Sequence, residues 1–265
     1  MKTFRLAVIG DPARHSLSPK IHSMFADALG VSVSYEAIDV TSDRLAEFVR
    51  SSRREFDGYN VTMPHKETII PLLDTLAISA GECGAVNAVR NTGRTLEGHS
   101  TDGYGVLRSL KPVLGEVSGK HAVIIGAGGA AIAAATAMVK AGAKVTVVSR
   151  REIELPGTDA AYFGQLNEVC KDAEVIINAT PLGMAGKEEF ADFEFLSGTA
   201  AVVFEFIYKP RETQLLREAR IRGLETVEGI SLLIWQAAEA FRIFTGTEVS
   251  DEVVSEICKK FETFV

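Results

Sequence analysis

Val123-Ile124-Ile125-Gly126-Ala127-Gly128-Gly129-Ala130 is an apolar run that leads straight into a glycine-rich turn and an alanine-rich segment. This order fits a strand, a tight turn and a helix that bind a dinucleotide, because glycines let the backbone approach a pyrophosphate and the helix N-terminus supplies amide donors. Ala131 takes the third glycine position of the pattern and still permits close helix–strand packing. The next strand-like run, Lys144–Val148, follows at the expected spacing. A dinucleotide site is therefore favoured over a glycine turn without a ligand.

The end of that next strand bears on the choice of cofactor. It reads Val148-Ser149-Arg150-Arg151, where a site for NAD typically carries an Asp or Glu that accepts from the ribose 2′-hydroxyl. A serine and two arginines suit a 2′-phosphate, which arginine binds by charge and by forked hydrogen bonds. A solvated basic pair is the alternative, and Glu152 and Glu154 stand nearby. We expect NADP in preference to NAD.

Apolar runs alternate with helical patterns on both sides of this stretch. Strand-like runs occupy Phe4–Ile9, Ser34–Val40, Gly58–Thr62, Val86–Arg90, Ala122–Ile125, Lys144–Val148, Glu174–Asn178, Ala201–Phe206 and Leu224–Val227. Helical spacing occupies Ile21–Leu29, Arg44–Ser51, Ala130–Lys140, Thr213–Arg222 and Leu232–Thr245. Such alternation predicts an α/β protein with parallel sheets covered on both faces. The segment 151–164 has no helical period, which predicts that the usual crossover helix is missing or very short there.

A composition change near Leu110–Lys120 predicts a domain boundary. Pro112, Gly115 and Gly119 stand there, just before the strongly apolar run. We expect one domain at 1–110 and a second at 111–230. The last helices, 231–265, end the chain, and periodicity does not assign them to either domain.

Composition and charge exclude several classes of protein. The chain has 265 residues, 46% of them hydrophobic and 24% charged, as in ordinary globular proteins. Its net charge of −7 argues against nucleic acid or an anionic membrane as the main partner. The three cysteines, Cys83, Cys170 and Cys258, are widely spaced, which predicts reduced thiols in the cytoplasm and no zinc site. Residues 122–139 are uncharged, but their glycines argue against a membrane span.

Polar side chains gather just beyond the apolar runs of the first half. They lie in GDPARHSLSPKIH (10–22), NVTMPHK (60–66), GAVNAV (84–89) and STDGYG (100–105). Ligands of parallel α/β sheets bind at the carboxyl ends of strands. Lys66 and Asp102 form a natural acid–base pair, although a lysine that pairs surface carboxylates and an aspartate that caps a helix are the alternatives.

Ser18-Pro19 predicts an N-cap followed by proline at the first helical position. With Ser16 close by, this helix start could hold a small carboxylate, and capping alone is the alternative. His15 and His22 lie seven residues apart, but His15 precedes the helix, so we expect no metal site.

These blocks, in this order, resemble shikimate dehydrogenase, together with NATPLGM (178–184), FEFIYKPRETQLL (204–216) and GISLLIWQAAEAF (229–241). The resemblance covers nearly the whole chain. It implies an N-terminal α/β substrate-binding domain and a Rossmann-type, doubly wound NADP-binding domain with a cleft between them. It also implies that helices 231–265 pack back onto the first domain. The reaction implied is the reversible, NADP-dependent reduction of 3-dehydroshikimate to shikimate. We expect a monomer or homodimer.

The resemblance also implies roles for individual residues. Catalysis falls to Lys66 and Asp102 at the reacting oxygen. The substrate residues implied are Ser16 and Ser18 at the carboxylate, Tyr208 near it, and Asn60, Thr62, Asn87 and Gln236 at the ring hydroxyls. The cofactor residues implied are Gly126, Ala127, Gly128, Gly129, Ala130, Ser149, Arg150, Arg151, Thr180, Phe206 and Gly229.

Four residues depart from the pattern of the resembled family. Ser100 replaces a usual asparagine, Glu205 a usual aspartate, Leu232 a frequent methionine and Ala88 a usual threonine. These departures leave open a paralogue that acts on quinate or uses NAD. A module that senses NADP and a metabolite without turnover is the remaining alternative, and the presence of both Lys66 and Asp102 argues against it.

Overall fold

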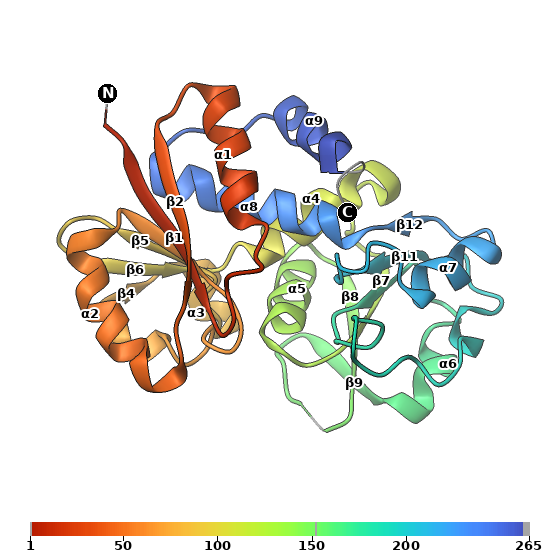
Figure 1. The fold of residues 1–265 in the computed structure, drawn as a ribbon. Helices are drawn as coiled ribbons and strands as arrows, with labels where there is room; N and C mark the ends of the chain where they lie inside the picture. Colours follow the sequence, from red (N-terminus) through yellow and green to blue (C-terminus); the bar gives the residue numbers. More distant parts are fainter. Residues whose placement is uncertain (1, 152, 262–265) are drawn as a thin grey trace. The chain divides into compact units, whose positions relative to one another are not determined.

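The computed structural model describes residues 2–151 and 153–261. The chain forms two compact units. The first consists of two segments, the residues up to Asp102 and Gln236–Lys260, and the second comprises Gly103–Trp235. Figure 1 colours the first unit red to yellow with dark blue at its end, and the second yellow-green to light blue. The composition change at Leu110–Lys120 lies in the last residues of a helix and the loop that follows it.

The first unit is built on a six-stranded mixed sheet. Its strands are β1 (Phe4–Gly10), β2 (Val33–Asp39), β3 (Gly58–Val61), β4 (Thr75–Leu76), β5 (Ala88–Asn91) and β6 (Leu96–His99). Its helices are α1 (Ser18–Leu29), α2 (Leu45–Glu55), α3 (Ile78–Cys83), the second part of α8 (Gly229–Thr245) and α9 (Asp251–Phe261). The strand order is β2-β1-β3-β5-β6-β4.

The expectation of parallel strands throughout is wrong for β5, which runs antiparallel to both β3 and β6. Residues 92–95 alone connect β5 to β6, and so short a connection can only join antiparallel strands. Gly93 adopts a φ of 81° in this hairpin, a left-handed conformation that favours glycine. β5 therefore begins at the edge of the sheet where β3 and β6 end.

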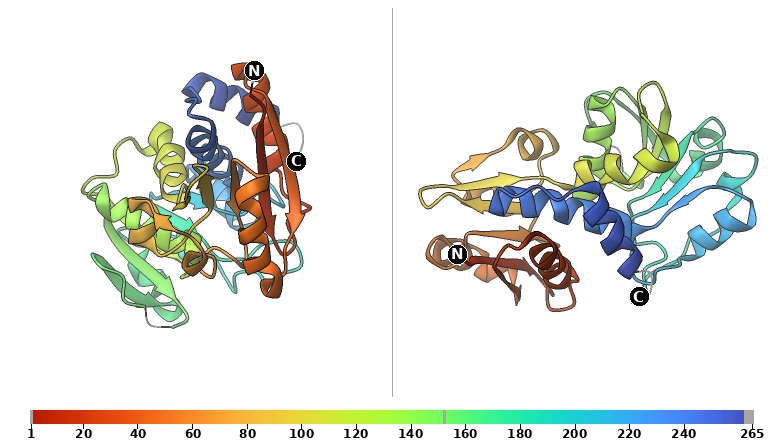
Figure 2. Two further views of the ribbon diagram at one scale, coloured as in Figure 1. Left: turned by 90° about the vertical axis from the view of Figure 1, so that its left-hand side faces the viewer. Right: turned by 90° about the horizontal axis from the view of Figure 1, so that it is seen from above.

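Alternating side chains of β1 build two apolar layers in the first unit. Ala7 and Ile9 pack with Leu45 and Val49 of α2, and Leu6 packs with residues of α8 that include Phe244. α1 packs against β1 and β2, and the views in Figure 2 show this helix beside the two long strands. Helices therefore cover both faces of this sheet.

The second unit is an all-parallel, doubly wound sheet. Its strands are β7 (His121–Ile125), β8 (Lys144–Ser149), β9 (Thr158–Tyr162), β10 (Val175–Asn178), β11 (Val202–Glu205) and β12 (Thr226–Val227). Its helices are α4 (Asp102–Leu114, which continues from the last residue of the first unit), α5 (Gly129–Lys140), α6 (Leu166–Val169), α7 (Gln214–Ile221) and the first part of α8.

The order β12-β11-β10-β7-β8-β9 is that of a Rossmann fold, and it reverses between β7 and β10. α5 covers one face of the sheet, where Ala134 and Met138 pack on Ile124, and α6 and α7 cover the other. No helix occurs between β8 and β9 in the residues described there, as the sequence predicts. The sequence did not predict β4, β6 and β9; two of them are edge strands of their sheets.

Trp235, the only tryptophan of the chain, belongs to α8 and packs against α4 in the second unit. The guanidinium of Arg108 lies 4.2 Å from the centre of its ring, and the ring of Tyr104 meets it edge-on at 6.4 Å. Trp235 is thus a packing residue, as expected from the sequence. Among the helices of the described chain, none is both long and apolar enough to cross a membrane.

Candidate active site

Polar side chains gather at one edge of the first sheet because β5 runs in the reverse direction. We call this the polar edge. Asn60 near the end of β3 pairs with Ala88 at the start of β5, and Ala88 pairs with His99 at the end of β6. Asn87 and the residues after His99 therefore emerge beside Asn60. The backbone amide of Val86 donates to the carbonyl of Lys66 at 2.8 Å, which fixes the Lys66 loop at the same edge.

Lys66 and Asp102 form a largely enclosed ion pair in the first unit. Lys66 Nζ lies 2.6 Å from Asp102 Oδ2, and the two side chains are 20% and 9% exposed. The other carboxylate oxygen, Oδ1, accepts from Asn87 Nδ2 at 2.7 Å. Since both oxygens of Asp102 are engaged in this way, the carboxylate holds one orientation and aims the ammonium of Lys66.

Asn87 is the centre of the surrounding hydrogen-bond network. Its Oδ1 accepts from the backbone amide of Thr101 at 2.8 Å, and its Nδ2 lies 2.9 Å from Thr101 Oγ1. Gln236 Oε1 lies 3.4 Å from both Asn87 Nδ2 and Thr101 Oγ1. Thr101 is fully buried and was not among the predicted site residues. Its position between Ser100 and Asp102 is the signal that could have identified it.

A second line of contacts joins α1 to the same edge. Tyr35 donates its hydroxyl to Asn60 Oδ1 at 2.7 Å, and Asn60 Nδ2 donates to the carbonyl of Asn87 at 3.0 Å. Burial raises the pKa of Tyr35 well above its usual value, and a hydrogen bond with Ser18 opposes this shift in part. Tyr35 was also missed, because a tyrosine on an edge strand carries no functional signature in the sequence.

The expected N-cap role of Ser18 is wrong, since Ser18 is the first residue of α1 and Leu17 occupies the N-cap position. Instead, the backbone amide of Ser18 donates to Ser16 Oγ at 3.2 Å, and the two hydroxyls lie 3.0 Å apart. Pro19 occupies the first turn as predicted. Thr62 lies against the start of this loop, because a Cβ on Gly10 would stand 2.4 Å from its Cγ2 atom.

The glycine turn of the second unit shows a tight side and an open side. Gly126 adopts a φ of 126°, and a Cβ there would stand 2.9 Å from the carbonyl oxygen of Ala179. A Cβ on Gly128 would meet nothing within 4 Å, and no side chain caps the N-terminus of α5. Ala127 lies in this turn, Gly129 and Ala130 begin α5, and all three are partly buried. The turn leaves room for a ligand beside uncapped helix amides, and it therefore fits a dinucleotide phosphate.

The remaining cofactor candidates lie in loops after β8, β10 and β11 and at the start of α8. Arg150 and Arg151 are exposed after β8, and Ser149 donates its hydroxyl to the carbonyl of Arg151, which shapes that turn. Thr180 Oγ1 donates to Asn178 Oδ1 at 2.7 Å.

Phe206 and Tyr208 follow β11, and Gly229 begins α8. Burial raises the pKa of Tyr208 above its usual value. Tyr208 thus belongs to the second unit, whereas the other substrate candidates belong to the first.

Comparison with protein families assigns most of the chain. Residues 8–89 match the shikimate dehydrogenase substrate binding domain, and residues 229–257 match the shikimate 5′-dehydrogenase C-terminal domain. Residues 113–202 match a family of NAD(P)-binding domains. The chain belongs to the shikimate dehydrogenase family.

Relatives of this family member match it over nearly their full length. The chain is 42% identical to the shikimate dehydrogenase (NADP(+)) of Thermococcus kodakarensis, over 90% of each protein. The shikimate 5-dehydrogenase of Thermus thermophilus, solved in complex with NADP(H) and shikimate, has a TM-score of 0.85 at 33% identity and covers 97% of this chain and 99% of its own. The 5-ketofructose reductase of a Gluconobacter strain has a TM-score of 0.84 at 28% identity and covers 98% and 99%.

Two further polar residues of this shikimate dehydrogenase family member, Ser100 and His22, lie outside the set of predicted site residues. The buried Oγ of Ser100, where the family usually has asparagine, has no hydrogen-bond partner among the described residues. His22 is fully buried, and its ring stacks on Tyr35 at 4.5 Å. Burial lowers the pKa of His22 to about 3, and a hydrogen bond with the side chain of Asn60 opposes this shift in part. Within residues 2–151 and 153–261, no group of three or more His, Cys, Asp or Glu side chains could hold a metal ion.

Proposed function

We propose that this protein is an NADP-dependent shikimate dehydrogenase, which reversibly reduces 3-dehydroshikimate to shikimate. The observation that carries the proposal is the pair formed by Lys66 and Asp102, enclosed within neutral hydrogen-bonding side chains in a chain of this family. An ammonium and a carboxylate held 2.6 Å apart can move a proton at a carbonyl or hydroxyl oxygen.

Substrate binding is assigned to the polar edge of the first sheet and to Tyr208. A substrate with one carboxylate and several hydroxyls needs many short donors and acceptors, because any buried group left without a partner costs about 1–3 kcal/mol. Ser16 and Ser18 provide adjacent hydroxyls for the carboxylate, and Tyr208 provides a third. The ring hydroxyls are assigned to Asn60, Thr62, Asn87 and Gln236.

Lys66 supplies the proton in the reductive direction. As the carbonyl oxygen gains negative charge, the ammonium of Lys66 stabilises it electrostatically and then transfers a proton to it. Asp102 keeps the ammonium in place through its Oδ2 atom. Lys66 is 20% exposed at its side chain, so the proton that it loses is replaced from solvent.

When bound, NADPH would supply the hydride in the reductive direction, and the second unit has the features to bind it. The turn Gly126–Ala130 and the first amides of α5 would hold the pyrophosphate. Arg150 and Arg151 would bind the 2′-phosphate, and Ser149 shapes their turn. Thr180, Phe206 and Gly229 would line the remaining part of the cofactor site.

Initial rates of reduction of NADP+ and of NAD+, each with shikimate and with quinate, test the proposal. Turnover with shikimate and NADP+ is expected to exceed that of the other three pairs. Higher kcat/KM with quinate or NAD+ would identify the paralogue instead, and Ser100 would then be the first position to examine. Folded protein that binds both ligands without turnover would identify a sensing module.

The protein is further proposed to act in the cytoplasm as a monomer or homodimer, without nucleic acid as a partner. The net charge of −7 argues against nucleic acid as a partner, and three widely spaced cysteines are typical of reduced thiols in the cytoplasm. Light scattering at micromolar concentration measures the oligomeric state directly, and a mass above that of a dimer would contradict the proposal.

A further inference from the structure

Glu205 is the only buried carboxylate among the described residues of the second unit. It is the last residue of β11, at the carboxyl edge of the sheet, and its side chain is fully enclosed. An ionised carboxylate so placed is costly, because removal from water disfavours its charge. Burial accordingly raises the pKa of Glu205 to about 7, while hydrogen bonds from neighbouring groups oppose the shift.

Three segments of the chain donate hydrogen bonds to this carboxylate. Asn178 Nδ2, at the end of β10, lies 3.0 and 3.1 Å from its two oxygens. The backbone amide of Ile207 donates to Oε1 at 3.0 Å, and the hydroxyl of Thr213 donates to Oε2 at 2.9 Å. All of these donors are neutral, so Glu205 forms no ion pair with them. We call Glu205 and its hydrogen bonds with Asn178, Ile207 and Thr213 the anchor.

The anchor extends into the loop after β10. Asn178 Oδ1 accepts from the amide of Thr180 at 3.0 Å and from its hydroxyl at 2.7 Å, and Thr180 Oγ1 accepts from the amide of Leu182 at 3.1 Å. The carbonyl of Ala179 lies so close to Gly126 that a Cβ on that glycine would stand 2.9 Å away. Glu205 is thereby connected to the glycine turn after β7.

The anchor also extends to the start of α8. The amide of Ile207 is held by Glu205, and a Cβ on Gly229 would stand 2.5 Å from the carbonyl oxygen of Ile207. Because Ile207 lies this close to Gly229, the loop after β11 cannot move toward α8. One carboxylate thus sets the loops 178–182 and 206–208 against Gly126 and Gly229.

We propose that Glu205 is a positioning residue that holds these two loops in the shape that binds the dinucleotide. That the dinucleotide is NADP rests on the proposed function, whereas the connection between the two loops rests on geometry alone. A carboxylate that only filled space would be replaced by an apolar side chain at lower cost. Its contacts with Asn178, which holds Thr180, and with the amide of Ile207, which follows Phe206, give it the different task of fixing where Thr180 and Phe206 lie.

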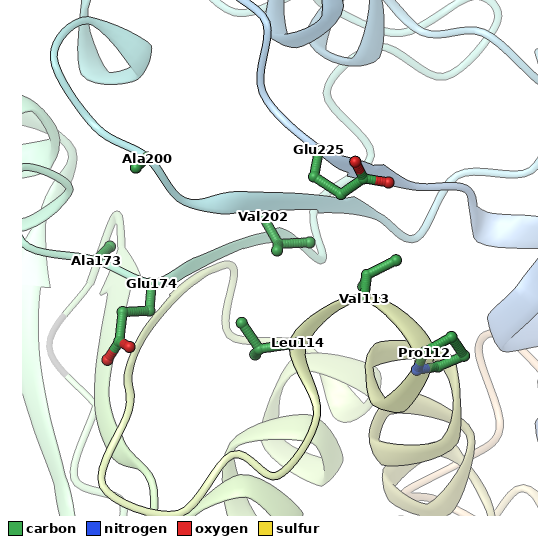
Figure 3. A pocket seen from close by; sticks show the side chains of 8 residues that line it. All are labelled: Pro112, Val113, Leu114, Ala173, Glu174, Ala200, Val202 and Glu225. Atoms are coloured by element: carbon green, nitrogen blue, oxygen red, sulfur yellow. The ribbon is translucent and has the colours of Figure 1, made fainter.

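The Glu205→Gln variant tests the proposal, because glutamine has nearly the same shape but presents an amide to a site made only of donors. Glu225→Gln is the matched control. Glu225 lies at the opposite, amino edge of the same sheet, in an open groove of about 730 Å³ lined by residues that include Pro112 and Val202 (Figure 3). This groove contains none of the residues assigned to the site.

Two measurements on the whole protein separate the anchor from the proposed function. Amide hydrogen exchange of residues 178–182 and 206–208, without ligand, is expected to be about tenfold faster in Glu205→Gln. Calorimetric titration with NADP+ is expected to give a Kd about tenfold higher, with the KM for shikimate within twofold of wild type. Glu225→Gln is expected to match wild type in both.

Unchanged exchange in folded Glu205→Gln would overturn the proposal, and so would faster exchange with an unchanged Kd for NADP+. If Glu205→Gln does not fold, Thr213→Val removes one donor and is expected to raise the Kd about threefold; an unchanged Kd overturns the proposal. Wild-type protein without shikimate turnover would reject the proposed function, while exchange and NADP+ binding would still decide the role of Glu205.

Discussion

The Nδ2 atom of Asn87 lies 2.7 Å from Oδ1 of Asp102, the carboxylate oxygen that Lys66 does not bind. Asn87 also accepts from the backbone amide of Thr101, so the side chain cannot rotate without losing contacts at both ends. The acid–base pair is consequently fixed by neutral groups from the residue just before β5 and from the residues after β6. Replacement of either residue of the pair should therefore lower kcat far more than it weakens substrate binding.

Lys66→Met and Asp102→Asn are each expected to lower kcat for shikimate oxidation by about 10²–10⁴-fold, the usual contribution of a positioned acid or base. The KM for shikimate should change much less. Lys171→Met, at an exposed position of the second unit, is the control. A Lys66→Met enzyme that keeps more than a tenth of wild-type kcat would contradict the assigned role.

Arg150→Ala and Arg151→Ala should weaken the use of NADP+ selectively. Hydrogen bonds to a charged group contribute about 1.5–3 kcal/mol, so kcat/KM for NADP+ should fall by about 10- to 150-fold. The value for NAD+, which lacks the 2′-phosphate, should stay within twofold. Steady-state kinetics with both cofactors check this, with Arg94→Ala in the β5–β6 hairpin as the control; equal losses for the two cofactors would disprove the assignment.

His22 should make the protein sensitive to acid. Its pKa is about 3 when folded and about 6.5 when unfolded, so below pH 6.5 the unfolded chain binds a proton that the folded protein does not. Relative to His22→Phe, wild type should lose about 2 kcal/mol of unfolding free energy between pH 6.5 and 5, and nothing above pH 7. Urea denaturation at pH 7 and 5 measures the loss, and parallel changes in the two proteins would refute it.

Glu205 should act in the opposite sense. Its pKa is about 7 when folded, above the value of 4.5 that it has when unfolded, so between these values the folded protein binds the extra proton. As pH rises from 4.5 to 7, wild type should therefore lose about 3 kcal/mol of unfolding free energy relative to Glu205→Gln. The difference should be constant above about pH 8. Thermal or urea unfolding across this range provides the test, and a difference that does not vary with pH would rule out a buried, titrating carboxylate.

Local patterns were sufficient to predict most of the second unit, with β9 as an exception. The apolar run before Gly126, the glycines and the alanine-rich helix are contiguous in sequence, and so is the loop that replaces a helix after Ser149. The direction of β5 was not predicted, because it depends on the short hairpin of residues 92–95 and not on periodicity. β4 has only two residues, Thr75–Leu76, too few for any pattern.

The candidate site was predictable to the extent that its chemistry is local. Lys66 and Asp102 were found because each stands in a polar block after an apolar run, and the structure places them in contact. Tyr35 and the anchor of Glu205 were not found. Their partners, Asn60 for Tyr35 and Asn178 for Glu205, are distant in sequence, and only pairing within each sheet brings them together.

Trp235 gives the protein an optical probe of its own. It is the single tryptophan of the chain, its ring lies under the guanidinium of Arg108, and its neighbour in sequence is Gln236. Emission excited selectively at the indole therefore comes from one place, where α4 meets α8, with no dye attached and no background to subtract. Any ligand or substitution that moves Arg108 away from the ring will change that emission in real time.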